Sequence, residues 1–399
     1  MPIVVFVLAT AVFAQGTSEF MLSGLLEPMA VDLGVPIGSA GLLTSLFAVG
    51  MIIGAPVMAA TASRWPARYS LAGFLAVFLA AHLVGALTTT FGLLLATRVV
   101  AAVANAGFLA VALAGLPAFV GADRVGRATS IILSGVTLAC VAGVPAGAIL
   151  GRALGWQSAF WAVVLVGVPA LAATWLLVPA GDRRDEPSGG HRPLRGELSA
   201  VGAPGVRVAM VVGALVNAAT FAGFTYLAVV VTEVGGVGEA WVPVVLALFG
   251  IGSFAGVSGA GRFADRQTSL VVAAGVVVLP IVWGATALTV SLLPVLLIMA
   301  VIAGATSFAV GSTVIGRIVR AAAPTAPRLS GAFATTAFNT GAAAGPAAAG
   351  VVIGISGSVS SALWTSAALA ALATVVTAAG RTKAPAPTAK EPVAETSTH

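Results

Sequence analysis

The residue most suggestive of chemistry is a single carboxylate inside a long apolar run. Glu19 lies in the segment Gly16 to Phe20, within an apolar stretch over 3–24. A charge at the bilayer centre costs about 2.5–3.5 kcal/mol on insertion scales, so intramembrane carboxylates usually serve a function. Because burial disfavours the ionised form, Glu19 is a candidate for binding and releasing protons. The alternative is a solvated, inert residue near an interface.

A second charge, Arg98, lies some seven residues into the apolar run 91–119. A guanidinium keeps its charge and needs a carboxylate, backbone carbonyls or a polar cavity. We predict that Arg98 tunes the proton affinity of Glu19 or orients a polar substrate group, unless its side chain reaches an interface. His82, in the run 69–89, is more simply interpreted as a packing or interface residue than as a proton relay.

Amide and aromatic side chains inside apolar runs mark a candidate substrate cavity. Amides can bind a neutral substrate without a charge cost, although they equally join helices to one another. Aromatic rings can line an apolar cavity, although contact with lipid or a neighbouring helix is their more frequent use. The predicted substrate-contacting residues are Glu19, Phe20, Asn105, Phe108, Asn217, Phe221, Phe224 and Asn339.

Small residues and proline recur in two runs. Small residues let helices approach closely, and proline permits a kink in a membrane helix. The first set lies in the run 128–150 and comprises Gly135, Gly143, Pro145 and Gly147. The second lies in the run 330–353 and comprises Gly341, Gly345, Pro346 and Gly350. Ordinary helix packing is the alternative interpretation.

The composition requires lipid as the main solvent. Of 399 residues, 59% are hydrophobic and 8% are charged, whereas soluble domains carry about 25% charged residues. A membrane-spanning helix needs about 20 apolar residues, whereas barrel strands would be alternating segments of about ten. We therefore predict an all-α polytopic membrane protein with twelve spans at 3–24, 39–61, 69–89, 91–119, 128–150, 157–179, 206–231, 240–261, 268–290, 292–315, 330–353 and 357–379.

The distribution of basic residues predicts the orientation. Of the 19 Lys and Arg residues, 17 lie in the loops after the second, fourth, sixth, eighth and tenth runs or in the C-terminal tail. Only Arg152 lies on the opposite side, and Arg98 lies inside a run. Since basic residues mark the cytoplasmic side, both termini are predicted to be cytoplasmic.

Two related halves are indicated by matching features at a constant offset. Ser63-Arg64 and Asp265-Arg266 are offset by 202 residues, and Pro145 and Pro346 by 201. Parallel repeats of this kind are typical of transporters with a central substrate site. We predict two pseudo-symmetric six-helix bundles over 1–180 and 206–380, a cytoplasmic central loop over 181–205 and a disordered cytoplasmic tail over 381–399.

Several function classes are disfavoured. Cys140 is the only cysteine and the three histidines are scattered, so neither a disulfide nor a metal site is expected. No GxxxxGK[ST] motif or nucleophile triad is present, which disfavours ATP as energy source and enzymatic activity. The net charge of +6 forms no basic stripe, so we expect no nucleic-acid partner. No cofactor is predicted.

The sequence resembles the major facilitator superfamily over about residues 3–380. The segment Gly261 to Asp265-Arg266 is similar to the family's gating loop, and the equivalent after the second run keeps only Arg64 and Arg68, with Ser63 where aspartate is usual. The segment from Thr97-Arg98 resembles the motif whose arginine is linked to proton coupling. The segment Gly135 to Gly147 is similar to the antiporter motif of exporters, with Gly143-Val-Pro145 in place of Gly-Pro.

Segments 16–22, 40–45, 104–113 and 249–254 resemble the bacterial chloramphenicol-resistance exporters of the drug:proton antiporter branch. This resemblance implies a monomeric antiporter of the bacterial cytoplasmic membrane that exports chloramphenicol or similar neutral aromatic drugs, driven by protons. It implies proton coupling by Glu19 and Arg98, and gating by Asp265 and Arg266. The alternatives are a sugar or metabolite exporter of the same superfamily, and a membrane sensor or receptor without transport.

Overall fold

The computed structural model describes residues 1–62, 65–121, 124–179, 197–326 and 329–382, with the backbone alone at 55–62, 117–118, 126, 130, 261–271 and 381–382. This described part is helical and contains no strand. The helices are α1 Ile3–Phe20, α2 Leu26–Asp32, α3 Ile37–Ala40, α4 Leu42–Ala62, α5 Ala67–Leu87, α6 Phe91–Val120, α7 Val125–Leu138, α8 Val144–Leu154, α9 Gln157–Leu177, α11 Pro204–Val229, α12 Val242–Thr289, α13 Leu293–Ala322, α14 Ser330–Ser356 and α15 Ser361–Thr382.

Twelve helical segments of the described chain are long and apolar enough to cross a membrane. They coincide with the twelve predicted runs, so the predicted fold class is confirmed. The first span, Ile3–Gly24, and the third, Ala67–Leu87, match the expected 3–24 and 69–89 closely. The tenth, Leu293–Ala322, extends well beyond the expected 292–315.

We predicted a loop between the eighth and ninth spans, and this prediction is wrong in one respect, because the backbone there is helical. Both spans belong to α12, and the residues between them include no proline and many good helix formers. The chain nevertheless reverses direction within α12. An ideal Cβ on Gly235, shortly before α12, would lie 3.0 Å from the carbonyl oxygen of Val290, directly after it. The two ends of α12 therefore lie together.

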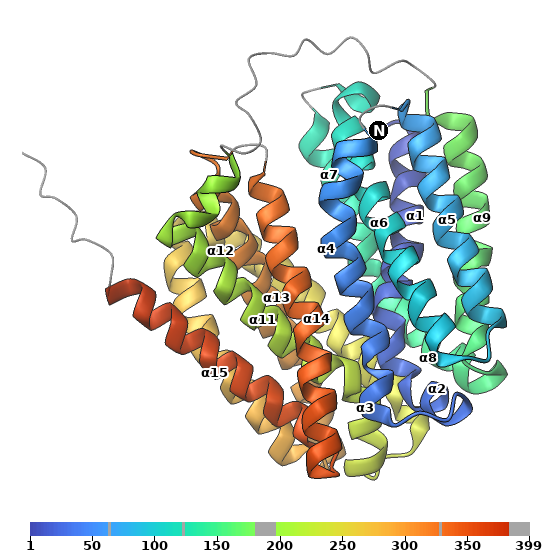
Figure 1. The fold of residues 1–399 in the computed structure, drawn as a ribbon. Helices are drawn as coiled ribbons and strands as arrows, with labels where there is room; N and C mark the ends of the chain where they lie inside the picture. Colours follow the sequence, from blue (N-terminus) through green and yellow to red (C-terminus); the bar gives the residue numbers. More distant parts are fainter. Residues whose placement is uncertain (63–64, 122–123, 180–196, 327–328, 383–399) are drawn as a thin grey trace, which may run out of the picture.

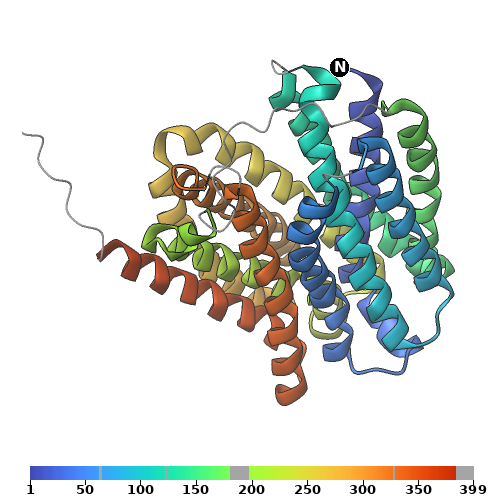
Figure 2. The same cartoon turned by 45° about the horizontal axis from the view of Figure 1, so that its top comes forward.

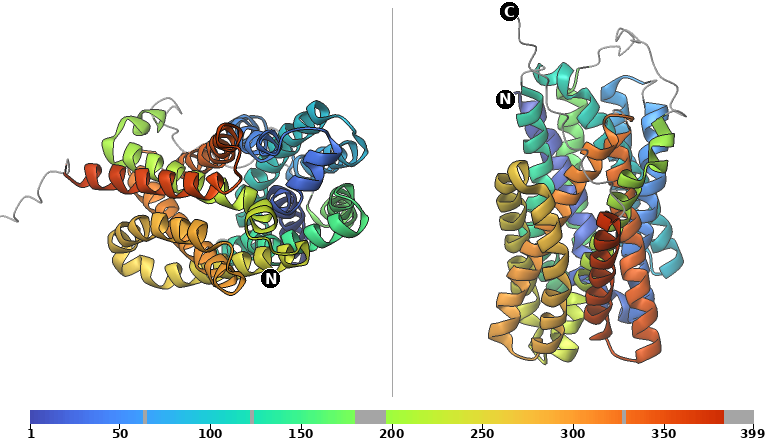
Figure 3. Two further views of the ribbon diagram at one scale, coloured as in Figure 1. Left: turned by 90° about the horizontal axis from the view of Figure 1, so that it is seen from below. Right: turned by 90° about the vertical axis from the view of Figure 1, so that its left-hand side faces the viewer.

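The helices form two halves that lie side by side (Figures 1, 2 and 3). One buried core is built wholly from residues of the first half, between Val4 and Val178. The other is built from residues Ala200 to Ala373 and also includes first-half residues, namely Phe20, Leu26, Ala40, Ala48, Cys140, Val144 and Ala148. The bounds predicted for the bundles stay predictions. Residues 180–196 of the predicted central loop and 383–399 of the predicted tail lie outside the described residues.

The halves meet at the end opposite the N-terminus (Figure 1). There α14 packs against α3 and α4, and α12 packs against α8. The contacts are close, since an ideal Cβ on Gly350 would lie 3.1 Å from the carbonyl carbon of Gly38. At the N-terminal end the two groups of helices are drawn apart in the same view.

Two spans depart locally from regular α-helix. The first changes from α1 to a 3₁₀ turn, Met21–Gly24, directly after Glu19 and Phe20. The fifth contains a π-helical turn, Ala139–Gly143, between α7 and α8. Pro145 follows this turn and has no N–H to donate to the preceding turn, which explains the local change in hydrogen bonding. Such π turns occur frequently at functional sites.

Candidate functional site

A cavity of about 310 Å³ lies between the two halves. Its wall is mainly apolar and is built from α1, α7, α11, α12, α13 and α14. Five of the residues predicted to contact substrate line it, namely Glu19, Phe20, Asn217, Phe221 and Asn339. Glu19 is the only ionisable residue among the described lining residues. Sequence reasoning missed Ser307 and Phe308, which also line the cavity.

Aromatic rings form one wall of this cavity. The ring centroids of Phe20 and Phe221 lie 5.7 Å apart, which joins α1 of the first half to α11 of the second. Phe224 does not line the cavity. It lies behind the wall, 6.1 Å from Phe20 and stacked at 4.7 Å on Phe249. Phe224 therefore supports the aromatic wall from outside.

The two amides present hydrogen-bond acceptors. Asn217 Nδ2 donates to the carbonyl of Phe338 at 2.7 Å, and Asn339 Nδ2 donates to the carbonyl of Thr335 at 2.9 Å. Within the described chain, neither Oδ1 has a hydrogen-bond partner. With the Glu19 carboxylate, the cavity offers acceptors to a ligand that carries O–H or N–H groups.

Arg98 is 1% exposed and binds the residue next to Glu19. Its Nη1 donates to Ser18 Oγ at 2.8 Å and its Nη2 to the Ser18 carbonyl at 2.9 Å. The guanidinium carbon lies 4.4 Å from the centroid of the Phe47 ring, a cation–π distance. Among the described residues, Arg98 forms no direct ion pair with Glu19, so its charge acts on the carboxylate from a distance.

His82 belongs to the same polar group, which sequence reasoning missed. Its Nε2 lies 2.5 Å from Ser18 Oγ, and its Nδ1 lies 2.8 Å from the carbonyl oxygen of Phe78. The ring also packs against Phe78 and Phe160 at centroid distances of 4.2 and 5.6 Å. Packing, as expected from the sequence, is thus one part of its role. The proximity of Ser18 to Glu19 was the only sequence signal for the other part.

The glycines of the span-5 motif allow that span to pack closely against the first span. An ideal Cβ on Gly135 would lie 2.6 Å from the carbonyl oxygen of Ala9. Gly143 packs directly against Thr17, and a Cβ on Gly147 would lie 3.3 Å from Met21 Cβ. Pro145 is buried. The motif therefore brings the interrupted fifth span against the helix that carries Glu19.

Comparison with known proteins decides the family. The model of the Major Facilitator Superfamily matches residues 8–328. The chain belongs to this superfamily. It is therefore a multi-pass membrane transporter rather than an enzyme, with twelve spans in the fold of that family.

Named relatives cover most of this superfamily member. A chloramphenicol resistance protein of Streptomyces lividans is 51% identical over 376 residues, which cover 94% of this chain and 95% of the relative. An inner membrane transport protein of Escherichia coli (strain K12), YdhP, is 30% identical over 347 residues, 87% of each chain. A purine ribonucleoside efflux pump, NepI, of Salmonella paratyphi A is 30% identical over 286 residues, 70% of this chain and 71% of the relative.

Solved structures share the superfamily fold. A bacterial homologue of the human lysosomal transporter Spinster, in an inward-facing and unoccupied conformation, aligns with a TM-score of 0.76 at 18% identity and covers 96% of this chain and 98% of that one. The nucleoside transporter NupG aligns with the same TM-score at 12% identity, covering 95% and 98%. At these identities the likeness concerns the fold alone.

Besides Phe224, two residues of this transporter that we predicted to contact substrate lie outside the cavity wall. Asn105 and Phe108 are buried in α6, and neither lines the cavity. Phe108 belongs to the core of the first half. Since apolar residues occur on all sides of α6, its sequence pattern could not show which side faces the centre.

The predicted gating residues are only partly described. Arg68 Nε donates to the carbonyl of Val178 at 2.6 Å, which ties the start of α5 to the end of α9. Arg64 lies outside the described residues. Gly261, Asp265 and Arg266 lie in the helical backbone of α12, and their side chains are likewise outside the description. Their gating role stays a prediction.

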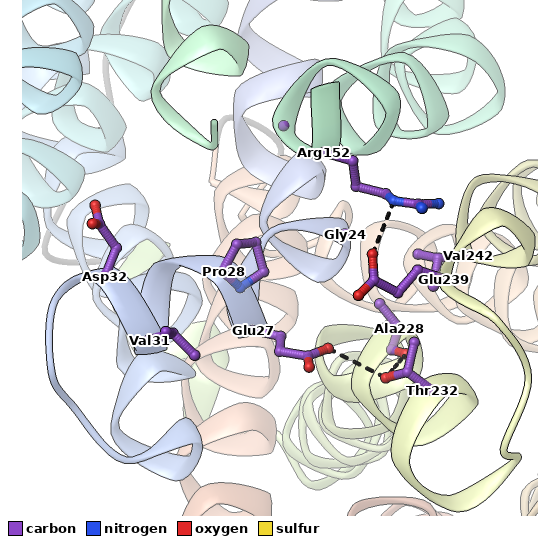
Figure 4. A pocket seen from close by; sticks show the side chains of 11 residues that line it. Gly24, Glu27, Pro28, Val31, Asp32, Arg152, Ala228, Thr232, Glu239 and Val242 are labelled. Atoms are coloured by element: carbon purple, nitrogen blue, oxygen red, sulfur yellow. Dashed lines mark hydrogen bonds and ion pairs between the residues drawn. The ribbon is translucent and has the colours of Figure 1, made fainter. Parts of the chain in front are cut away.

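Polar contacts join the halves at the end opposite the N-terminus, around a second pocket (Figure 4). Arg152 Nε lies 3.2 Å from Glu239 Oε2, and Thr232 Oγ1 donates to Glu27 Oε2 at 3.2 Å. Both contacts connect a residue of the first half with one of the second. The helices α2 and α8, which carry Glu27 and Arg152, lie at the end opposite the N-terminus in Figure 1.

Proposed function

We propose that this transporter exports chloramphenicol, or a similar small neutral aromatic drug, from the cytoplasm in exchange for protons. The observation that carries the proposal is the cavity between the halves, where one carboxylate, Glu19, lies among aromatic rings and amide acceptors. The relative named a chloramphenicol resistance protein, 51% identical over 94% of this chain, supports the choice of drug.

The chemistry of the cavity suits such a molecule. Chloramphenicol carries an aromatic ring, one amide N–H and two hydroxyl groups. The ring matches Phe20 and Phe221, and the three donors match the acceptors of Asn217, Asn339 and Glu19. The volume, about 310 Å³, lies at the lower end of the range of roughly 300–1,000 Å³ found for small-molecule pockets.

The positions of the contacts between the halves support alternating access. The proposal takes the N-terminal end of the helices to face the cytoplasm of a bacterial cell, with the protein in the cytoplasmic membrane, and the distribution of basic residues supports this orientation. The contacts Arg152–Glu239 and Thr232–Glu27 then close the outer end. In this state the cavity receives drug from the cytoplasm or the inner leaflet. Rocking of the two halves about the cavity would open it to the outside.

Proton exchange would supply the energy. An ionised Glu19 in an apolar cavity is costly, and a proton arriving from outside removes that charge and favours drug release. A proton-motive force of about 150 mV is worth roughly 3.5 kcal/mol per charge. At 1.4 kcal/mol per tenfold, this supports a gradient of a few hundredfold for a neutral drug. The proposal needs no cofactor and no second subunit.

The test is chloramphenicol efflux from an efflux-deficient bacterial host. Wild-type protein should lower drug accumulation, and a protonophore should abolish the effect. Glu19→Gln should bind drug but lose uphill export. Glu233→Gln is the matched control, because this exposed carboxylate lies near the end of the seventh span and outside the cavity. Proton-driven export that persists in Glu19→Gln would remove Glu19 from the coupling role.

A further inference from the structure

The α-helix of the first span ends directly after Glu19 and Phe20, and side chains donate hydrogen bonds to carbonyls of its last turn. Carbonyls in the last turn of an α-helix lose their intrahelical partners. At the end of α1 the N–H of Met21 still donates to the Thr17 carbonyl. The next carbonyl, of Ser18, accepts Arg98 Nη2 at 2.9 Å, and the carbonyl of Phe20 accepts Ser23 Oγ at 3.1 Å. Arg98 therefore donates to a carbonyl in the last turn of α1, within the first span.

A cation is well suited to this position. The C-terminal end of a helix carries partial negative charge, which favours a guanidinium there. The second bond, from Arg98 Nη1 to Ser18 Oγ at 2.8 Å, fixes the plane of the guanidinium against α1. Ser18 is fully buried, so both bonds are shielded from water. One residue of α1, directly before Glu19, thus holds the arginine of α6.

The direction of each hydrogen bond in this group follows from the partners. The carbonyl of Phe78 can only accept, so His82 Nδ1 carries the proton that binds it at 2.8 Å. In the neutral ring, Nε2 is then the acceptor, and the Ser18 hydroxyl donates to it across 2.5 Å. This leaves the Ser18 oxygen to accept from Arg98. The chain of donors runs from Arg98 through Ser18 and His82 to the Phe78 carbonyl.

We propose that Ser18 and His82 are positioning residues that hold Arg98 on the end of α1 and thereby fix Glu19 at the cavity wall. We call the group of Ser18, His82 and Arg98 the α1 clamp. His82 orients the Ser18 hydroxyl, and Ser18 in turn orients the guanidinium. Among the described residues, the charged group that acts on the ring of His82 is Arg98 of α6. The ring also contacts Ser18 of α1, which directly precedes Glu19, and Phe160 of α9. The consequence for transport rests on the proposed function, but the clamp itself does not.

Hydrogen exchange of the purified full chain tests the clamp without any drug. The backbone amides of residues 18–24 should exchange about tenfold faster in Ser18→Ala and His82→Leu, the effect of losing about one hydrogen bond. His82→Gln should stay near wild type, because its amide oxygen can still accept from Ser18. Ser45→Ala is the matched control, since it removes another buried first-half hydroxyl, one that has no hydrogen-bond partner among the described residues. Unchanged exchange in Ser18→Ala, or an equal rise in Ser45→Ala, would overturn the clamp.

The pH profile of export separates positioning from mere packing. A guanidinium released from Ser18 no longer favours the ionised carboxylate, so Ser18→Ala and His82→Leu should move half-maximal export to higher pH. His82→Gln should restore the wild-type profile, and Ser45→Ala should keep it. Identical profiles in all four variants would contradict the positioning role. Absence of proton-dependent export in the wild type would instead overturn the proposed function. The hydrogen-exchange experiment alone would then test whether the α1 clamp exists.

Discussion

The hydroxyl of Tyr226 in α11 donates to the carbonyl of Gly38 in α3 at 3.1 Å and so joins the two halves. The same hydroxyl lies 3.1 Å from the carbonyl oxygen of Pro346 in α14. Gly41, at the start of α4, packs directly against this hydroxyl and leaves no room there for a Cβ atom. At the end opposite the N-terminus, the two halves are thus in close contact around one tyrosine.

Gly41→Ala should therefore loosen this closure. Overpacking of a tight contact costs about 1–3 kcal/mol, which corresponds to a shift of roughly 5–150-fold in a two-state equilibrium. Spin labels attached through Val31→Cys and Ile355→Cys, both on exposed side chains, should show a larger population with the two halves apart. The native Cys140 is buried and should remain unlabelled.

The control for that variant is Gly73→Ala, since a Cβ at Gly73 meets no atom within 4 Å. Its distance distribution should equal that of the wild type. Adding Tyr226→Phe to Gly41→Ala should recover part of the closed population, because the atom in the way is removed. Equal distributions for Gly41→Ala and Gly73→Ala would contradict the account of this end.

Arg152→Ala should have a much smaller effect on the same equilibrium. The side chains of Arg152 and Glu239 are 37% and 64% exposed, so water screens their attraction. Exposed ion pairs contribute about 0–1 kcal/mol, which limits the shift to less than about fivefold. The same spin-label pair checks this, with salt titration of the wild type as a second measurement. A shift larger than that of Gly41→Ala would reverse the ranking of the two contacts.

Two glycines of the span-5 motif should respond differently to alanine. Gly143 packs directly against Thr17, whereas a Cβ on Gly147 would lie 3.3 Å from Met21 Cβ. Gly143→Ala should lower the yield of folded protein and reduce export several-fold, because α1 and the fifth span must separate. Gly147→Ala should be tolerated. Thermal unfolding followed in detergent, with efflux assays in parallel, measures both, and equal tolerance of the two changes would contradict the packing argument.

Arg98→Ala should abolish uphill export, and Arg98→Lys should restore only part of it. Alanine leaves the Ser18 carbonyl without its partner, and an ammonium group cannot reproduce the planar pair of bonds to Ser18 Oγ and O. Efflux against a drug gradient measures this, and downhill drug exchange should be affected less. Wild-type uphill export by Arg98→Ala would remove Arg98 from the mechanism.

Much of the fold could be predicted because the membrane constrains it strongly. Long apolar runs must be helices in lipid, so the positions of the twelve spans followed directly. Glu19 was also recognisable, because a carboxylate within such a run is rare. The cavity wall was harder to predict. Phe108 and Phe221 look alike in sequence, yet Phe108 lies in the first core and Phe221 faces the cavity.

Contacts between distant segments could not be predicted. The bond between Ser18 and His82 joins residues 64 positions apart, and that between Tyr226 and Gly38 joins residues 188 positions apart. Serine, histidine and tyrosine at these positions show no pattern that distinguishes a polar partner from ordinary packing. The helical backbone of α12 between its two spans was also missed, because charged residues at the end of an apolar run suggest a loop.

The unequal make-up of the two buried cores has a consequence for biosynthesis. The first core is complete once residue 178 has been made, whereas the second includes side chains from α1, α2, α3 and α4 and from the fifth span. Since domains fold as units and the N-terminal one is synthesised first, we expect the first six helices to assemble in the bilayer while translation continues. The later helices would then fold against a surface that is already formed.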